Sequence, residues 1–228
     1  MEVLYMNSAV LLTAVISCTA LSAETTPVHN HISTANQEIA LTFDDGPDVD
    51  NTPKILDILE RYNIKATFFM LGQNVDAHPE VVKKVFEKGH AIGLHTYTHP
   101  NFNRLNKEEI RKEILVNRDA IEKATGYRSD IIRPPYGIVN DDFLCVAKEL
   151  DLTVYTWSRD SFDWKTSNKE AEIIRNVTDG VHPGNIILMH DKTSNQLHSR
   201  NALPRIIAFL KNRGYRFVTL KGNEKQDQ

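Results

Sequence analysis

The sequence predicts an α/β protein with a parallel sheet. It contains about seven strand–helix units, a number that favours a barrel related to the eight-stranded (β/α) barrel over an open sheet. Short apolar segments alternate with helix-like segments along most of the chain. Several of the apolar segments have no polar face, as expected for strands that are covered on both sides. Periodicity alone does not decide whether the sheet closes into a barrel.

Capping residues and apolar periodicity give the elements in chain order. The first strand, 38–43, leads to a helix that Thr52 can cap, with Pro53 in its first turn. Asn106 opens a longer helix that ends at Gly126. The other predicted strands are 66–71, 90–95, 152–157, 185–190 and 215–220, with 130–135 in the position of a further strand. The other predicted helices lie within 78–89, from about 140, from about 168 and within 203–214.

Composition indicates one globular domain. The chain has 228 residues, of which 41% are apolar and 25% are charged. A net charge of −3 and a pI of about 6.3 imply no basic face, which argues against nucleic acid as a partner. We expect a monomer whose domain spans 38–222, followed by a polar tail at 223–228.

The N-terminus differs in character from the rest of the chain. No charged residue occurs from Val3 to Ala23, and small residues end this run. This predicts a signal segment (1–23) with cleavage near Ala23, followed by a polar linker (24–37). Because no Lys or Arg precedes the run, an uncleaved membrane anchor is an alternative. A third reading is a lipoprotein-like processing site at Cys18, which the residues 15–18 resemble. We therefore expect a bacterial protein outside the cytoplasm, secreted or bound to the cell envelope, that meets the membrane only through this segment.

Ionisable residues gather just after the predicted strands. The carboxyl ends of the strands of a parallel α/β barrel share one face, and active sites lie there. Five separate strand ends therefore predict one functional site. The clusters are Asp44 and Asp45, His95 and His99, Arg133, Asp160 and Asp163, and His190 and Asp191.

The first two clusters indicate a metal centre. His95 and His99 are four residues apart, and in a helical turn both imidazoles would face the same way and hold one metal. One of Asp44 and Asp45 can complete the ligand set, and the other can act as a base on metal-bound water. Two histidines and a carboxylate suit hydrolytic zinc but also oxygen-activating iron. A solvated Asp-Gly-Pro turn is the plain alternative, and it leaves the other clusters unexplained.

The remaining clusters indicate acid–base chemistry. Arg133 can pair with a carboxylate at the mouth of the barrel, or it can be an ordinary surface arginine. Asp163 can orient and charge the imidazole of His190, beside an apolar wall of Trp164 and Leu188. The alternative is a structural His–Asp pair beneath a buried tryptophan.

Taken together, the five clusters make the sequence closely resemble the polysaccharide deacetylases of carbohydrate esterase family 4, the NodB-homology domain. The resemblance runs from about Glu38 to Leu220 and implies a distorted (β/α) barrel with about seven parallel strands. Five family motifs occur in order: TFDDGP (42–47), HTYTH (95–99), RPPYG (133–137), DSFDW (160–164) and LMHD (188–191).

The resemblance also implies roles for individual residues. Asp45, His95 and His99 would bind one divalent metal, with zinc expected and cobalt or nickel as alternatives. Asp44 corresponds to the general base, positioned by Arg133. The further implied roles are His190 as the general acid, Asp163 as the residue that tunes it, Tyr136 as an oxyanion donor through its backbone N–H, and Trp164 and Leu188 as the lining of the pocket for the acetyl methyl group.

The implied activity is metal-dependent N-deacetylation of an N-acetylhexosamine polymer, with release of acetate. The first expected substrate is peptidoglycan N-acetylglucosamine, ahead of N-acetylmuramic acid, chitin oligomers and an exopolysaccharide. A non-catalytic glycan-binding relative ranks lower because every functional motif position is present. A hydrolase of small non-sugar amides and an iron oxygenase are further alternatives.

Overall fold

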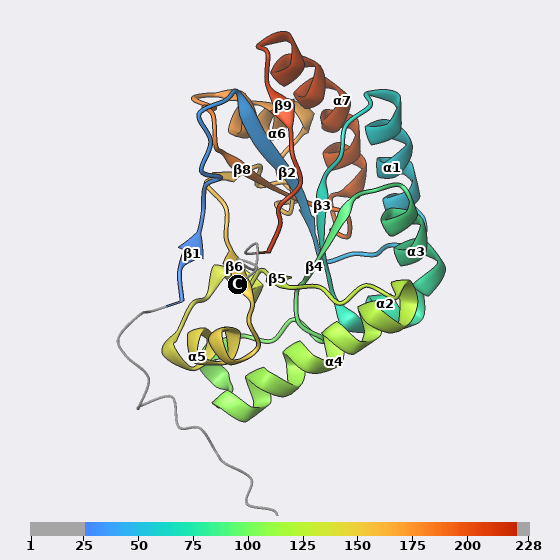
Figure 1. The fold of residues 1–228 in the computed structure, drawn as a ribbon. Helices are drawn as coiled ribbons and strands as arrows, with labels where there is room; N and C mark the ends of the chain where they lie inside the picture. The colour runs from blue at the N-terminus through green and yellow to red at the C-terminus, as the bar shows by residue number, and fades with distance from the viewer. Residues whose placement is uncertain (1–25, 223–228) are drawn as a thin grey trace, which may run out of the picture.

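A curled sheet of parallel strands forms the centre of the structure, a computed structural model that describes residues 26–222 (Figure 1). The strand order is β1-β6-β5-β4-β3-β2-β8-β7, and β9 pairs with β2 outside this path. Within 26–222 the two end strands, β1 and β7, do not pair with each other, so the barrel is incomplete. The strands are β1 (Val28–His29), β2 (Glu38–Asp44), β3 (Thr67–Met70), β4 (Ala91–Leu94), β5 (Ile131–Ile132), β6 (Thr153–Tyr155), β7 (Arg159–Asp160), β8 (Ile186–His190) and β9 (Arg216–Phe217).

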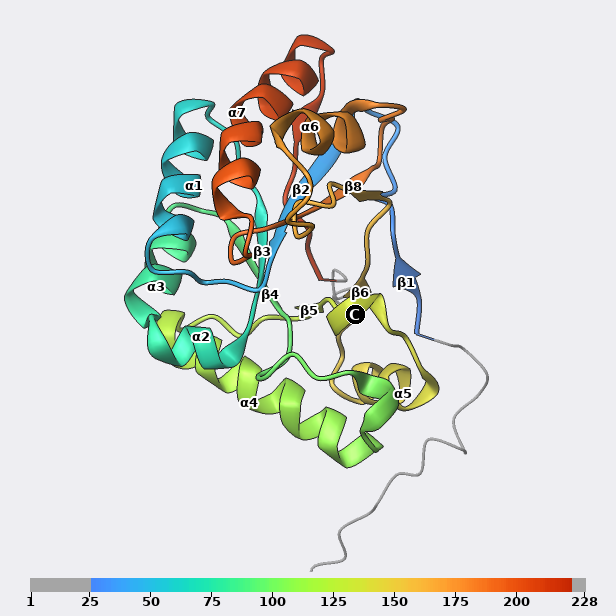
Figure 2. The same ribbon diagram turned by 180° about the vertical axis from the view of Figure 1, so that it is seen from behind.

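The described helices lie along the outside of this sheet, from α6 and α7 round to α4 and α5, and leave the side at β1 uncovered, as the two opposite views show (Figures 1 and 2). The predicted distorted barrel of parallel strands is therefore confirmed. The α-helices are α1 (Asn51–Arg61), α2 (Gly72–Ala77), α3 (Pro79–Glu87), α4 (Lys107–Thr125), α5 (Asp141–Glu149), α6 (Glu170–Thr178) and α7 (Gln196–Asn212). Two short 3-10 turns occupy Phe102–Arg104 and Pro135–Gly137.

Capping residues set the ends of α4 and α5 as predicted. The Asn106 side chain accepts the backbone N–H of Glu109, and the Glu109 side chain accepts that of Asn106, which is a capping box. Gly126 ends α4 with φ 74°, a conformation that glycine adopts without a steric penalty. Asn140 caps α5 by accepting the N–H of Phe143.

The prediction that Thr52 caps α1 is wrong. The N-cap residue is Asp50, and Thr52 lies inside the helix. The side chain of Asp48 instead accepts the N–H groups of Asp50 and Asn51, at 3.0 and 2.7 Å. This leaves the Thr52 hydroxyl free to donate to the Asp191 carboxylate at 2.5 Å.

Residues 26–37, expected to be part of a linker, instead lie against the domain. Val28 and His29 form β1 and pair with β6, and His31 forms an isolated bridge with Asn185. The N–H of Ile32 donates to the carbonyl of Gly184 at 2.8 Å. The predicted segments 1–23 and 223–228 lie outside the described residues.

The strand residues alternate between two apolar clusters. Leu41 and Phe43 of β2 belong to the large core that the sheet makes with the helices, whereas Ala40 belongs to a smaller cluster with Phe69. Thr42 and Asp44 lie on the same side of β2 as Ala40, because side chains alternate along a strand. Asp44 is therefore the last inward-facing position of a buried strand.

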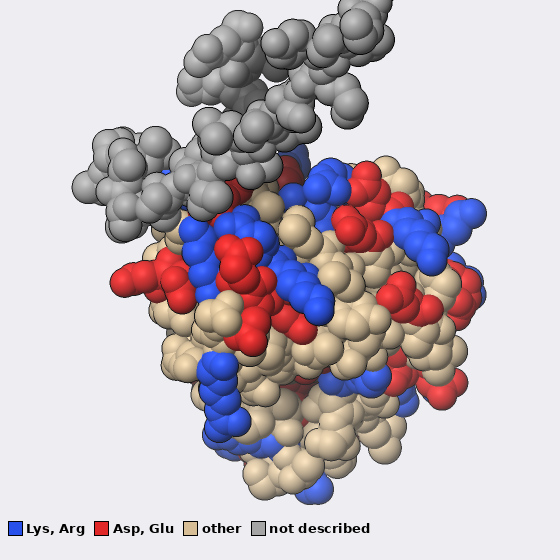
Figure 3. Space-filling view, turned by 90° about the horizontal axis from the view of Figure 1, so that it is seen from below, with Lys and Arg blue, Asp and Glu red and all other residues tan. Residues whose placement is uncertain are grey.

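The surface carries charges of both signs. On the face shown in Figure 3, which includes α4, lysines and arginines are mixed with acidic residues. Glu149 of α5 pairs with Lys107 and Arg111 of α4, which ties these two helices together. Among residues 26–222, no helix has the length and apolar character that crossing a membrane requires.

Candidate metal and acid–base site

The carboxyl ends of the strands bring the predicted residues together at one end of the sheet. In the parallel pairing of β2 with β8, Asp44 is level with His190, so these two motifs are neighbours. Asp44 is also level with Phe69 of β3, and Leu94 of β4 is level with Ile132 of β5. His95 and Arg133 directly follow these last two residues, and Asp160 of β7 is level with Leu188 of β8, so all five motifs open at the same face.

Asp45, His95 and His99 form a group with the geometry of a metal site. One ligand atom from each lies within 4.8 Å of the other two. The Oδ1 atom of Asp45 is 3.4 Å from Nε2 of His95 and 3.5 Å from Nε2 of His99. Tetrahedral zinc with bonds of about 2.0–2.2 Å holds its ligand atoms about 3.3–3.5 Å apart. The buried Asp45 Oδ1 has no hydrogen-bond partner in the described part of the chain, which fits an atom that binds a cation.

Hydrogen bonding fixes the ring of His95. Its Nδ1–H donates to the backbone carbonyl of Arg133 at 2.7 Å, which directs Nε2 toward Asp45 and His99. This is the arrangement of a metal-binding histidine whose second nitrogen is held by the protein. His95 is buried, at 2% exposure, so its orientation does not depend on solvent.

The HTYTH segment is not the helical turn that the spacing predicted. It is a loop in which Thr96 and His99 have left-handed backbones, with φ 70° and 64°. The carboxylate of Glu113, from α4, accepts the N–H groups of Tyr97 and Thr98 and the Thr98 hydroxyl, at 2.8 to 3.0 Å. The two imidazoles therefore converge because α4 anchors the loop.

Asp44 has a different set of partners from its neighbour. Its Oδ1 accepts Nη1 of Arg133 at 2.7 Å, and its Oδ2 is 3.8 Å from Nε2 of His95. Arg133 is fully buried, donates also to Thr42 and to the carbonyl of Thr156, and lies over the Phe69 ring. Burial lowers the pKa of Arg133, and the Asp44 carboxylate opposes this change. The predicted pairing of Arg133 with a carboxylate is therefore present.

His190 and Asp163 form a second, tightly bonded pair. The Nδ1–H of His190 donates to Asp163 Oδ1 at 2.7 Å, and the His190 backbone N–H donates to Asp163 Oδ2 at 2.9 Å. The Ser199 hydroxyl of α7 also donates to Oδ2, at 2.6 Å. Burial opposes the imidazolium charge, but the hydrogen bond and charge of Asp163 raise the pKa of His190 to about 9. At neutral pH the imidazole therefore carries a proton.

The other predicted residues differ in their exposure. Tyr136 is 62% exposed, and its ring lies edge-on to His99 with centroids 4.5 Å apart. Trp164 is 46% exposed, so the alternative of a buried tryptophan above the His–Asp pair is wrong. Leu188 is buried in β8. Asp160 accepts the N–H of Phe162, and burial raises its pKa.

Left-handed backbones concentrate in the loops of the site. Within the described range, 26–222, five of the seven non-glycine residues with positive φ belong to the site's motifs: Asp45, Thr96, His99, Tyr136 and Phe162. Such conformations cost roughly 1–3 kcal/mol each and persist where the surroundings fix them. The site therefore depends on the residues that hold these loops.

Sequence reasoning missed those supporting residues. Glu113 and Asn117 lie one turn apart in α4, and Asn117 accepts the N–H of His95 at 2.9 Å. Ser199 completes the partners of Asp163, and Thr52 binds Asp191, whose pKa burial raises to about 7. The only signal of Glu113 and Asn117 in the sequence is that they are polar residues of a predicted helix, whereas Ser199 lies before the helix predicted within 203–214.

Comparison with known proteins identifies relatives over most of the chain. The sequence profile of the polysaccharide deacetylase family matches residues 31–155. A peptidoglycan-N-acetylglucosamine deacetylase of Bacillus cereus is 45% identical over 184 residues, which cover 80% of this chain and 66% of that protein. The peptidoglycan-N-acetylmuramic acid deacetylase PdaC of Bacillus subtilis is 38% identical over 210 residues, which cover 89% of this chain and 44% of PdaC.

Solved structures agree with the sequence comparison. The crystal structure of the Bc1960 peptidoglycan N-acetylglucosamine deacetylase, in complex with an N-oxidanyl-benzamide compound, has a TM-score of 0.81 and 41% identity. The similarity covers 86% of this chain and 91% of that one. The two curated relatives above are longer, and this chain spans less than two thirds of the length of either.

Proposed function

Because this chain belongs to the polysaccharide deacetylase family, we propose that it is a metal-dependent N-deacetylase that removes acetyl groups from N-acetylhexosamine residues of a polysaccharide. The complete set of site residues supports this proposal, since a metal-ligand group, a carboxylate–arginine pair and a charged histidine meet at one face. The reaction cleaves the amide C–N bond with water and yields acetate and a free amine.

One divalent ion, with zinc as our first choice and cobalt or nickel as alternatives, fits the group of Asp45, His95 and His99. When bound, it would polarise the amide carbonyl and lower the pKa of a bound water. The protein holds the three ligands in advance, through the hydrogen bond of His95 to Arg133 and the anchoring of the HTYTH loop by Glu113. Such preorganisation keeps the cost of assembling the site low.

Asp44 is the proposed general base. Its Oδ1 is held by Arg133, which leaves Oδ2 on the side of His95, toward the metal ligands. A water that lies there can transfer its proton to Oδ2 as it attacks the carbonyl carbon. The nearby guanidinium offsets the negative charge that two adjacent carboxylates bring to a buried position.

His190 is the proposed general acid. The leaving amine needs a proton, and the imidazole carries one at neutral pH because Asp163 raises its pKa to about 9. Asp163 also fixes the tautomer, because it accepts Nδ1–H and leaves Nε2–H to face the substrate. The proton moves from Nε2 to the amine nitrogen as the C–N bond breaks.

Three further residues complete the proposal. We assign the Tyr136 backbone N–H to the oxyanion of the tetrahedral intermediate, where one such donor contributes roughly 3–4 kcal/mol. The exposed Trp164 and the buried Leu188 are the proposed lining for the acetyl methyl group.

We propose peptidoglycan as the substrate, with N-acetylglucosamine as the first choice of sugar. The names of the relatives support this choice, and one of them acts on N-acetylmuramic acid. Chitin oligomers and an exopolysaccharide are the alternatives. A peptidoglycan substrate agrees with a bacterial protein that is secreted or bound to the cell envelope, and we propose that it acts as a monomer.

Acetate release from purified peptidoglycan and from chitin oligomers, measured in parallel, tests this function. The chain is treated with chelator, and zinc is then restored. Metal-restored release from peptidoglycan alone supports the proposal, and release from chitin alone would replace the substrate. Tight binding of zinc and glycan without any release would instead support a non-catalytic glycan-binding protein.

A further inference from the structure

Asp191 is a buried carboxylate that the proposed reaction does not use. It directly follows His190 in the LMHD motif, and its side chain is completely buried. Its Oδ2 accepts the Thr52 hydroxyl at 2.5 Å, whereas its Oδ1 has no hydrogen-bond partner among residues 26–222. A buried polar atom left without a partner costs free energy, so this position calls for an explanation.

Asp191 contacts the chain on both sides of the metal ligand Asp45. Its backbone N–H donates to the carbonyl of Asp44 at 3.2 Å. Its carboxylate packs so closely on Gly46 that a Cβ atom at Gly46 would overlap it. Between these two contacts, Asp45 has a left-handed backbone with φ 74°. Asp191 therefore supports the segment whose conformation aims Oδ1 of Asp45 at the two histidines.

The start of α1 holds Asp191 in place. The Thr52 hydroxyl accepts the N–H of Asp48 at 2.8 Å and donates to Asp191, so one hydroxyl joins the turn that follows Asp45 to Asp191. The amide of Asn51 donates to the backbone carbonyl of Asp191 at 2.9 Å. Both Asn51 and Thr52 are buried, which shields these bonds from water.

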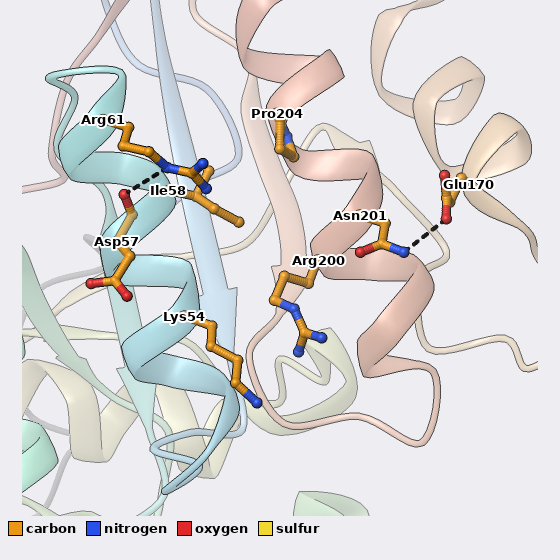
Figure 4. Close-up of a pocket in the computed structure, with 8 residues that line it drawn as sticks. All are labelled: Lys54, Asp57, Ile58, Arg61, Glu170, Arg200, Asn201 and Pro204. Atoms are coloured by element: carbon orange, nitrogen blue, oxygen red, sulfur yellow. Dashed lines mark hydrogen bonds between the residues drawn. The ribbon is translucent and has the colours of Figure 1, made fainter.

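The outer end of this network reaches α7. Arg200 donates from Nη1 to Oδ1 of Asn51 at 2.6 Å, which orients the amide toward Asp191. Figure 4 shows Arg200 in the groove between α1 and α7, a space of about 640 Å³, together with Arg61 from the opposite side. Arg61 donates to the carbonyl of Asp57 on its own helix, at 3.4 Å. The two arginines thus share a groove, but only Arg200 connects to Asp191.

We propose that Asp191 is a positioning residue for the metal ligand Asp45, and that the Thr52 and Arg200–Asn51 contacts set how tightly the site binds its metal. This inference rests on the proposed function, since it concerns the same metal site. It predicts that residues without any contact to the ion control its affinity. Changes in such outer partners typically lower metal affinity about 10–100-fold.

The test measures zinc affinity by competition with a chromophoric chelator, separately from acetate release. Asp191→Ala removes the support under Gly46, and we expect a loss of zinc affinity of about 10–100-fold. Asp191→Asn keeps the size and one acceptor for Thr52, so we expect it to recover part of this affinity. The visible spectrum of the cobalt-loaded protein should change in the alanine variant, because the ligand field depends on the Asp45 carboxylate.

Two matched pairs keep the test independent of whether the Asp191 variants fold. Thr52→Val removes the hydroxyl and Thr52→Ser keeps it, so only the valine variant should lose zinc affinity. Arg200→Met cuts the link to Asn51 and should weaken binding a few-fold, whereas Arg61→Met in the same groove should not. Thermal unfolding of the metal-free proteins shows that each variant is folded before affinities are compared.

The outcomes separate this inference from the proposed function. Wild-type protein that binds none of zinc, cobalt and nickel, or that releases no acetate from any glycan, contradicts the function. Wild-type zinc affinity in folded Asp191→Ala, or equal affinities within both matched pairs, overturns the positioning role while the function stands. Reduced affinity together with recovery of kcat at saturating zinc supports the role.

Discussion

Replacing Asp163 with asparagine removes the negative charge that keeps His190 protonated. The carboxylate accepts three donors: Nδ1–H and the backbone N–H of His190, and the Ser199 hydroxyl. An asparagine has one acceptor oxygen and is neutral. Burial lowers the pKa of His190, while the charges of Asp44 and Asp45, which the variant keeps, still raise it. This variant should therefore bring that pKa from about 9 back to near the ordinary 6.5.

The magnitude follows from the protonated fraction of His190. A pKa of about 9 leaves roughly 0.9 of the imidazole protonated at pH 8, whereas a pKa of 6.5 leaves roughly 0.03. The proposed general acid works only when protonated, so wild-type activity should persist below pH 9 and fall as the pH rises through about 9. In Asp163→Asn the fall should begin at least about 2 pH units lower, with about 30-fold less activity at pH 8.

The assay is the pH profile of kcat/KM for acetate release at saturating zinc, from pH 5.5 to 10. Ser199→Ala is the matched control, because it removes one hydrogen bond to Asp163 but keeps the charge; its alkaline limb should move less. A titration of the His190 ring by NMR reads the same pKa directly. If the activity of Asp163→Asn falls at the same alkaline pH as that of the wild type, Asp163 does not set the pKa of the general acid.

The same pKa shift makes a stability prediction with a defined sign. The folded-state pKa of His190, about 9, lies above the ordinary histidine value of 6.5, a difference worth about 3 kcal/mol. This stabilisation is fully present below pH 6.5 and is lost as the pH rises through about 9. The difference in unfolding free energy between wild type and Asp163→Asn, from urea denaturation, should therefore shrink between pH 6 and pH 10.

Four further variants test other parts of the site. Asp44→Asn should lower kcat about 10²–10⁴-fold with zinc binding retained, measured by acetate release and zinc titration; unchanged kcat would exclude its role as base. His99→Ala removes a ligand and should weaken zinc binding, in chelator competition, by more than the about 10–100-fold of an outer-shell change. Arg133→Met leaves the buried Asp44 unpaired and should cost about 3–5 kcal/mol in urea denaturation, so an unchanged midpoint contradicts the pairing. Glu113→Gln should weaken zinc binding about 10-fold, and wild-type affinity would mean that the HTYTH loop holds its shape without this charge.

Local signals predicted the helices of this fold better than its short strands. Asn106 and Gly126 bound α4 as expected, because a cap and a terminating glycine act within one turn of the helix. β1 and β7 were missed, since each has two residues and lies in a polar segment, where no periodicity can develop. These strands form through partners distant in sequence, as in the pairing of β7 with β8.

The candidate site was also predicted in part: the sequence indicated which side chains meet, but not the backbone that brings them together. Residue types and their places after strands predicted which side chains meet, since parallel strands deliver their carboxyl ends to one face. The backbone of the HTYTH loop could not be predicted, because a spacing of four residues fits a helical turn as well as this loop. What decides between them is Glu113 of α4, which binds Tyr97 and Thr98. The spacing of four residues thus predicts that the two histidines can hold one metal more reliably than it predicts the backbone conformation between them.

The adjacent aspartates show how two neighbours acquire different roles. Side chains alternate along a strand, so Asp44, in line with Thr42, faces inward, where Arg133 neutralises it. Continued extended backbone would turn Asp45 to the opposite side, against the helices. Its φ of 74° instead breaks the alternation and brings Oδ1 to the two histidines. Two features therefore stabilise the adjacent aspartates: the guanidinium of Arg133, 89 residues after Asp44, and the left-handed backbone of Asp45. A sequence pattern displays neither the contact nor the backbone conformation.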